Sequence, residues 1–177
     1  MQTDLFDLYR RGSEWCGEKV AGTTTLDAPT SCEGWTVRDL LNYMLETQHY
    51  FAGSARGEDV SPPGPNPPRL LTKDPVDDFA TARADVLQAF RQEGALEKTG
   101  PALGIAFSDQ LLHGWDLATA TSQDPTMPDG LAEAAYKAIH GLFTEEQRRG
   151  VFKPELPVGD DPTAQERLLA YTGRPSS

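Results

Sequence analysis

Hydrophobic residues recur at steps of three and four positions along most of this chain, which is the spacing of one face of an α-helix. The pattern predicts helices over about residues 3–21, 36–55, 75–94, 103–120 and 128–143, then a short helix that begins after Pro162 and ends at Gly173. The sequence contains no sustained alternation of apolar and polar residues, the pattern that predicts a strand. Four long helices with two shorter ones predict an all-α bundle.

The helix predicted over 36–55 has the clearest start and the clearest faces. Thr36 offers a hydroxyl cap and Asp39 stands three positions later, which is typical of a capping box. The helical spacing places an apolar stripe on one face and polar residues on the opposite face. The expected stripe is Val37, Leu40, Leu41, Met44, Gln48 and Phe51, and the expected polar face is Asn42, Glu46 and His49.

A proline-rich segment follows this helix. Residues 57–75 contain six prolines, which a helix interior does not tolerate, so a long ordered loop is expected. A loop of this length either borders a functional site or is a surface excursion. The sequence alone favours neither, and we predict that the loop borders the pocket entrance.

Composition and charge restrict the class of partner. The chain has 177 residues, enough for one domain over residues 1–177, with 27 acidic and 16 basic residues and a net charge of -11. This charge repels phosphate backbones and anionic membrane surfaces, so neither nucleic acid nor a membrane is an expected partner. A small-molecule substrate is expected, and a homodimer stays open.

The cysteines and the N-terminal segment indicate the compartment. Cys16 and Cys32 are too few for a disulfide framework and lack the close spacing of a zinc or redox motif. The first residues are acidic, where a secretory signal needs a basic start and an apolar run. We therefore expect a cytoplasmic protein.

The helix predicted over 103–120 carries the most reactive set of side chains. Asp109, His113 and Asp116 follow one another at offsets of four and three, so they share one stripe of the helix with Ile105 and Leu112. A carboxylate and an imidazole one turn apart can hold a divalent metal or act as an acid–base pair. The same pattern also fits a solvated polar face or a core histidine satisfied by a neighbouring carboxylate, and spacing alone favours these structural interpretations because such pairs are common.

Three ordered segments resemble one known family. Residues 28–42, Ala-Pro-Thr-Ser-Cys-Glu-Gly-Trp-Thr-Val-Arg-Asp-Leu-Leu-Asn, resemble the first signature of the DinB-like, mycothiol-dependent maleylpyruvate isomerase N-terminal superfamily. Residues 113–121, His-Gly-Trp-Asp-Leu-Ala-Thr-Ala-Thr, resemble its second signature. Residues 168–175 resemble the end of a single-domain branch of that superfamily.

The resemblance implies a DinB-like four-helix bundle, with additional short helices and the long Pro-rich loop. In that family a pocket at one end holds zinc or nickel on three side chains, and two of these fall on Asp109 and His113. The third falls on Tyr43, where the family has a histidine. Neutral tyrosine is a poor ligand because the phenol, with a pKa of about 10, must first lose its proton. We therefore expect Asp109, His113 and Tyr43 as site residues, with weakened metal binding.

Other polar and aromatic residues receive structural interpretations. His49 is turned away from the stripe that Tyr43 adjoins, and His140 lacks a motif, so neither is an expected ligand. Cys32 is more typical of an inert turn cysteine than of a nucleophile. Trp35 and Trp115 are expected to pack together with a bridging pair between Arg38 and Asp116.

Three functions remain open from the sequence. The resemblance implies an isomerase or transferase that uses mycothiol or another low-molecular-weight thiol as cofactor. A metal-independent enzyme would use His113 and Asp109 as acid and base, with the Tyr43 hydroxyl stabilising an oxyanion. A non-catalytic small-molecule or stress-related binding protein would use the same pocket.

Overall fold

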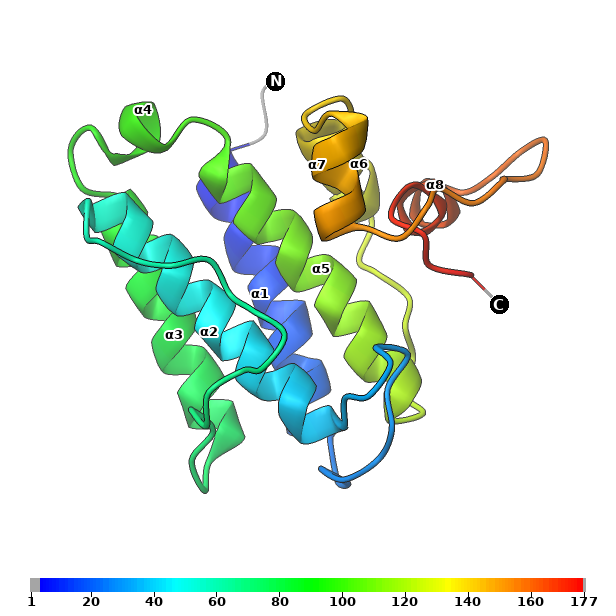
Figure 1. Cartoon of the computed structure of the whole chain (residues 1–177), viewed down its shortest axis with the longest axis horizontal. Coiled ribbons are helices and arrows are strands. Elements are labelled where there is room, and N and C mark those ends of the chain that lie inside the picture. Colours follow the sequence, from blue (N-terminus) through cyan, green and yellow to red (C-terminus); the bar gives the residue numbers. More distant parts are fainter. Residues whose placement is uncertain (1–3, 177) are drawn as a thin grey trace.

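The structure, a computed structural model, describes residues 4–176, and the part it describes is built from helices. The prediction that the first helix begins at Thr3 lies outside the described residues. Figure 1 shows the elements, which are α1 (Leu5–Ala21), α2 (Val37–Arg56), α3 (Pro75–Phe90), α4 (Ala95–Thr99), α5 (Ala102–Ala120), α6 (Leu131–Ile139), α7 (Glu145–Val151) and α8 (Ala164–Tyr171). The all-α prediction is confirmed.

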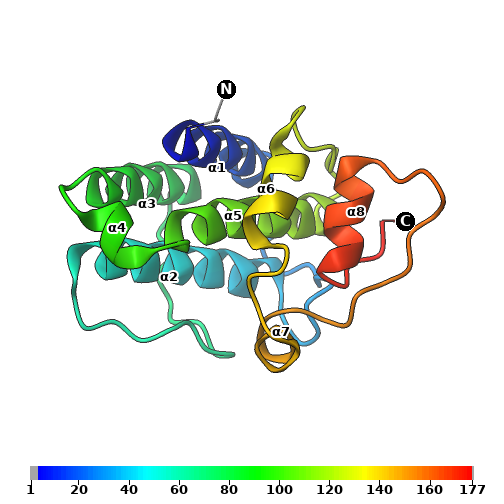
Figure 2. The same cartoon turned by 90° about the horizontal axis from the view of Figure 1, so that it is seen from above.

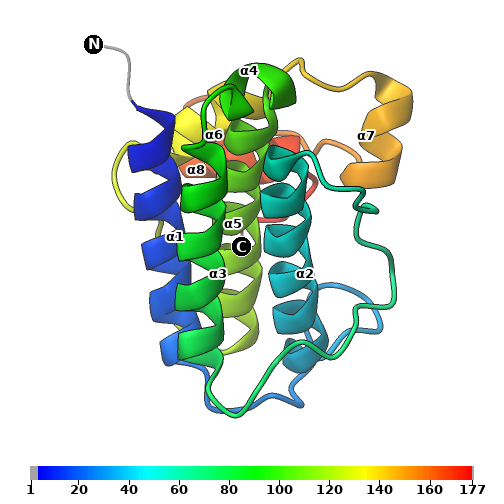
Figure 3. The same ribbon diagram turned by 90° about the vertical axis from the view of Figure 1, so that its left-hand side faces the viewer.

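The four long helices α1, α2, α3 and α5 form the bundle, and Figure 3 shows them standing side by side. Two clusters of buried apolar side chains fill its interior, one of which extends under α6 and α8. Figure 2 shows α6, α7 and α8 on one side of the bundle, with the end of the chain beside α8. No helix within residues 4–176 is long and apolar enough to cross a membrane.

α5 is buried on most of its circumference because it packs against α1, α2 and α6. Its contact with α1 depends on glycines. A Cβ added at Gly114 would lie 2.7 Å from Trp15 Cζ3, and one added at Gly12 would lie 3.0 Å from Phe107 Cδ2. The two backbones therefore approach more closely than larger side chains allow. This packing places the polar residues of α5 inside the protein.

Local signals fix several helix starts. Thr36 accepts a hydrogen bond from the Asp39 backbone N–H, and the Asp39 carboxylate accepts one from the Thr36 N–H, so the predicted capping box is confirmed. At the start of α3, the Asp74 side chain accepts from the Asp77 N–H, with Pro75 in the first turn.

The opposite polar face predicted for α2 is wrong at Asn42. The Asn42 side chain is buried, and its Oδ1 accepts hydrogen bonds from the backbone N–H groups of Leu70 at 2.9 Å and Leu71 at 2.8 Å. The proline-rich loop, residues 57–74, runs along the outside of α2 (Figure 3) and covers this side chain. Asn42 therefore anchors the loop rather than facing solvent.

The helix predicted over 128–143 is shorter in the structure. α6 ends at Ile139 because His140 is extended and Gly141 has a φ of 74°, and Thr144 then caps a separate helix, α7. The predicted end of the third helix near Gly94 is also too late. α3 ends at Phe90, and Gly94 instead precedes the five-residue helix α4.

Candidate functional site

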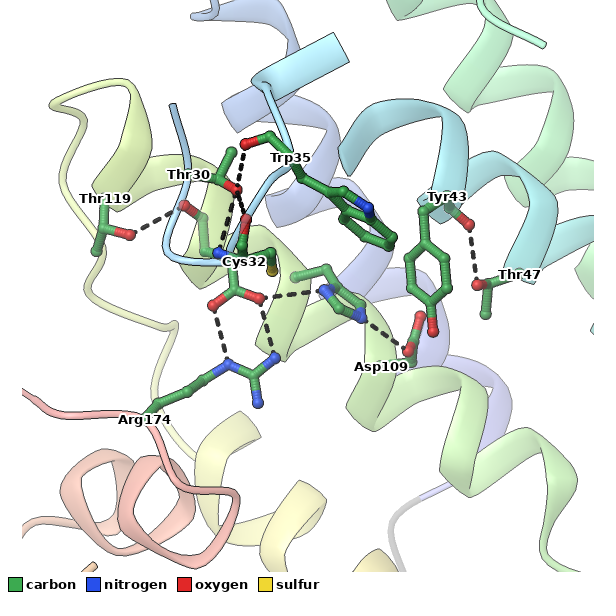
Figure 4. A network of polar contacts seen from close by, with 10 residues as sticks. Thr30, Cys32, Trp35, Tyr43, Thr47, Asp109, Thr119 and Arg174 are labelled. Carbon is green, nitrogen blue, oxygen red and sulfur yellow. Dashed lines mark hydrogen bonds and ion pairs between the residues drawn. The ribbon is translucent and has the colours of Figure 1, made fainter. Parts of the chain in front are cut away.

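His113 on α5 contacts a carboxylate through each of its two ring nitrogens. Nε2 lies 3.2 Å from Asp109 Oδ1 and Nδ1 lies 3.1 Å from Asp116 Oδ2. The two partners stand one turn before and one turn after His113 on the same helix, which brings the three side chains together. Figure 4 shows the resulting network of polar contacts.

The charge of His113 follows from these contacts. Ionised carboxylates only accept hydrogen bonds, so both ring nitrogens donate when the imidazole is protonated. Burial lowers the pKa of His113, but Asp109 and Asp116 outweigh burial, and the pKa is raised to about 9. His113 is therefore a cation at neutral pH, held between two carboxyl groups.

Asp116 is the most deeply buried member of the network, with 2% of its side chain exposed. Its Oδ1 lies 2.9 Å from Arg174 Nε and its Oδ2 lies 2.9 Å from Arg174 Nη2. Burial raises the pKa of Asp116, yet Arg174 and His113 hold it well below its usual range. The predicted pair between Arg38 and Asp116 is wrong, because exposed Arg38 lies 3.6 Å from Asp27.

Tyr43 reaches the same place from α2. Its ring centroid lies 5.1 Å from that of His113, edge to face, and 5.0 Å from that of Trp35. Figure 4 shows the Tyr43 hydroxyl beside Asp109. Burial raises the pKa of Tyr43 to about 12, so the phenol is neutral at neutral pH. The structure thus brings together the three residues that the sequence singled out.

A cavity of about 590 Å³ opens over this network. Its polar floor includes His113 and Asp116, and Tyr43 and Trp35 form an aromatic wall. Residues 63–65 of the proline-rich loop form part of the lining, which confirms that the loop borders the cavity. Residues 31–33 and Trp115 add to the lining, and residues 150–153 and 172–175, which the sequence did not assign to the site, complete it.

The donors do not fit a divalent metal. Both nitrogens of His113 already contact carboxylates, and the neutral phenol of Tyr43 is a poor ligand. Asp109 Oδ2 is buried without a hydrogen-bond partner, so this oxygen is free to bind a metal ion. One oxygen ligand alone does not make a metal site. Within residues 4–176, no three His, Cys, Asp or Glu side chains gather as metal ligands do.

The two remaining histidines lie outside the contacts of His113, and the thiols of both cysteines have raised pKa values. His49 is exposed on α2, and His140 stacks on Tyr136 with ring centroids 4.8 Å apart. Cys16 is fully buried, and burial raises the pKa of its thiol to about 12. Cys32 lines the cavity, and burial raises the pKa of its thiol too, which favours the unreactive protonated form.

Comparison with known families now identifies the lineage. Residues 16–118 match the model of the mycothiol maleylpyruvate isomerase N-terminal domain. The chain belongs to this family. The matched segment contains Tyr43, Asp109, His113 and Asp116, whereas Arg174 lies beyond it.

Two curated proteins are similar to this chain, the uncharacterized proteins MT0763 and Rv0738, each from a strain of Mycobacterium tuberculosis. Each is 27% identical to the chain over 162 residues, which cover 84% of this chain and 85% of the relative. No solved structure matches the chain.

Arg174 is the site residue that sequence reasoning missed. It stands 58 residues after Asp116, and no local spacing connects the two. One available signal was the Gly-Arg pair directly after a helix, because a glycine in that position fixes the direction of the residue that follows it. The sequence alone indicates only that residues 168–175, which include Arg174, resemble the end of related chains.

Proposed function

We propose that this protein is a small-molecule enzyme in which His113 acts as a general acid without a metal. The observation that carries the proposal is the contact of both His113 ring nitrogens with carboxylates at the floor of the cavity. A buried imidazolium can give a proton to an oxygen of a bound substrate, such as a carbonyl oxygen, when its Nε2–H exchanges Asp109 for that oxygen while Nδ1–H stays on Asp116. Asp109 and Asp116 stabilise the cation and orient its ring.

Tyr43 supplies a second donor. Its phenol is neutral, lies against His113 and lines the cavity, so its hydroxyl can donate to a developing oxyanion. The aromatic wall and the cavity volume suit a small organic molecule. The reaction class that these groups support is proton transfer, as in an isomerisation, in which the neutral imidazole left after protonation takes a proton from another atom of the same substrate.

Family membership favours a second candidate at the same cavity. The description of the family names a maleylpyruvate isomerase and mycothiol. In this alternative the sulfur of a low-molecular-weight thiol bonds to an electrophilic carbon of the substrate, His113 protonates the substrate, and the proton lost by the thiol returns to the His113 imidazole.

The test uses protein purified without a metal-affinity tag. Elemental analysis is expected to find zinc and nickel far below one equivalent, and unsaturated keto acids are then assayed with and without a low-molecular-weight thiol. We expect turnover in metal-free protein, loss of turnover in His113→Gln, and retention in His49→Gln, which alters an exposed histidine of α2. Turnover that requires added zinc or nickel would refute the metal-free role, and binding without turnover would indicate a binding protein.

A further inference from the structure

The end of α8 fixes the position of Arg174. The Arg174 backbone N–H donates to Leu169 O at 2.8 Å, and the Gly173 N–H donates to Ala170 O at 3.0 Å. With a φ of 79° at Gly173, these bonds form a Schellman motif, in which a left-handed residue ends the helix. The helix end therefore sets the direction in which Arg174 leaves α8.

A close approach of two chain segments strengthens this placement. A Cβ added at Gly173 would lie 2.5 Å from Lys153 Cβ and 2.8 Å from the Lys153 carbonyl carbon. Gly173 is thus packed directly against the segment before α8, where no larger residue fits. The two segments, 150–153 and 172–175, line the same cavity.

The Arg174 guanidinium binds Asp116 at two points. Its Nε and Nη2 each lie 2.9 Å from a different oxygen of the carboxylate, and the Oδ2 of that carboxylate also contacts His113 Nδ1. A two-point contact between a planar guanidinium and a carboxylate fixes the plane of the carboxylate. Asp116 is then unable to turn away from the imidazole.

We propose that Arg174 is a positioning residue, which holds the His113 ring in one orientation by clamping Asp116. The inference rests on the proposed function, in which His113 is the acid. It extends that function to a residue outside the segment that matches the family model. α8 thereby contributes to the site through the residue that its C-terminal cap presents.

The experiment observes the imidazole ring directly by nuclear magnetic resonance of protein with labelled histidine nitrogens. The chain has three histidines, so His113→Gln assigns the signals of interest, and His49 and His140 are internal references. We expect a slowly exchanging Nδ1 proton on His113 in the unaltered protein. Arg174→Gln should lose this signal, whereas Arg167→Gln, which alters an exposed arginine of α8, should retain it.

Arg174→Lys provides a second measurement in case the glutamine variant does not fold. An ammonium keeps the charge but does not reproduce the planar two-point contact, so the His113 signal should persist at a changed chemical shift. A folded Arg174→Gln protein with an unchanged signal would overturn the proposal. So would an Arg174→Lys spectrum that superimposes on that of the unaltered protein.

Neither measurement needs turnover, which separates this inference from the proposed function. Loss of the ring signal in Arg174→Gln together with undiminished turnover would uphold the positioning role and contradict the acid role of His113. Loss of both would support the two together.

Discussion

His113 occupies an environment in which the surrounding charges alternate. Asp109 and Asp116 flank its ring, and Arg174 balances the second carboxylate. Each charge is largely removed from water, so each depends on its neighbours for stabilisation. The protonation state of one imidazole is therefore linked to the free energy of folding.

The linkage predicts how stability varies with pH. The pKa of His113 is raised from 6.5 to about 9 in the folded protein, so its stabilising contribution is complete below about pH 6.5 and disappears as the pH rises through 9. A rise of the His113 pKa from 6.5 to about 9 corresponds to about 3 kcal/mol. Urea unfolding should show His113→Gln less stable than the unaltered protein by up to about this amount at pH 6, with a much smaller difference at pH 10.

His49→Gln is the control for this measurement, because His49 is exposed and should show no such convergence. A stability difference between the unaltered protein and His113→Gln that stays constant from pH 6 to pH 10 would contradict the charge assigned to His113.

Tyr43 offers a second test at the residue scale. Its ring faces His113, so Tyr43→His should place a second imidazole in the cavity wall next to His113. Neutral imidazole binds zinc or nickel without the cost of deprotonating a phenol, so the variant should bind these ions more tightly than the unaltered protein. Calorimetric titration with zinc measures the difference, and Tyr43→Phe controls for loss of the hydroxyl. Equal affinities in the histidine and phenylalanine variants would argue against Tyr43 as the position of the third ligand.

At the scale of elements, the site depends on how closely α5 is drawn into the bundle. Gly114 allows α1 to approach α5 directly beside His113. A change at this contact moves the helix that carries three of the polar side chains. Densely packed side chains leave little room for adjustment, so even one added methyl group displaces its neighbours.

Substitution of glycines distinguishes close packing from helix propensity. Gly114→Ala should destabilise the protein by about 1–2 kcal/mol, because the added methyl group would meet Trp15 at 2.7 Å. Gly17→Ala, on α1, meets Arg83 Nη1 only at 3.6 Å and should stabilise by roughly 0.5–1 kcal/mol. Urea unfolding measures both. If the two substitutions changed the free energy of unfolding equally, α1 and α5 would have room for a methyl group at Gly114.

At the scale of the whole molecule, the cavity is assembled from segments that are far apart in sequence. The loop along α2 is held at one point by the buried amide of Asn42 and at another by Trp35, whose Nε1 donates to Pro65 O at 3.2 Å. α5 supplies the floor, and Tyr43 of α2, Trp35, the proline-rich loop and residues 150–153 and 172–175 supply walls.

Replacing residues 61–66 with a shorter Gly/Ser segment tests the wall formed by the loop. Residues 68–72 remain, so Asn42 keeps both of its partners, and the stability should change by about 0.5 kcal/mol or less. The Trp35 indole loses its hydrogen bond to Pro65 O and becomes more exposed to solvent, whereas Trp15 and Trp115 stay buried. Tryptophan emission should therefore shift to longer wavelength, and Trp35→Phe should abolish the shift. Unchanged emission would place Trp35 outside the contact with the loop.

The sequence predicted what is local and missed what is distant. The capping box at Thr36 and the juxtaposition of Asp109 with His113 follow from spacings of three and four residues, which a helix converts directly into contacts. Asn42 was placed on a polar face because periodicity does not foresee a loop that returns to cover a helix. Arg174 was missed for the same reason, since its partner lies on another helix.

The distance between Asp116 and Arg174 also has a consequence for the order of events during translation. The bundle helices are complete once α5 has been made, but Arg174 follows Asp116 by 58 residues. At synthesis rates of about 5–20 residues per second, the nascent chain carries Asp116 for several seconds before its guanidinium partner exists. A bundle that folded during that interval would bury a carboxylate whose strongest counter-charge, Arg174, is missing. The His113 imidazole therefore acquires its final set of contacts only after the ribosome has added Arg174, later than the bundle helices that contain it.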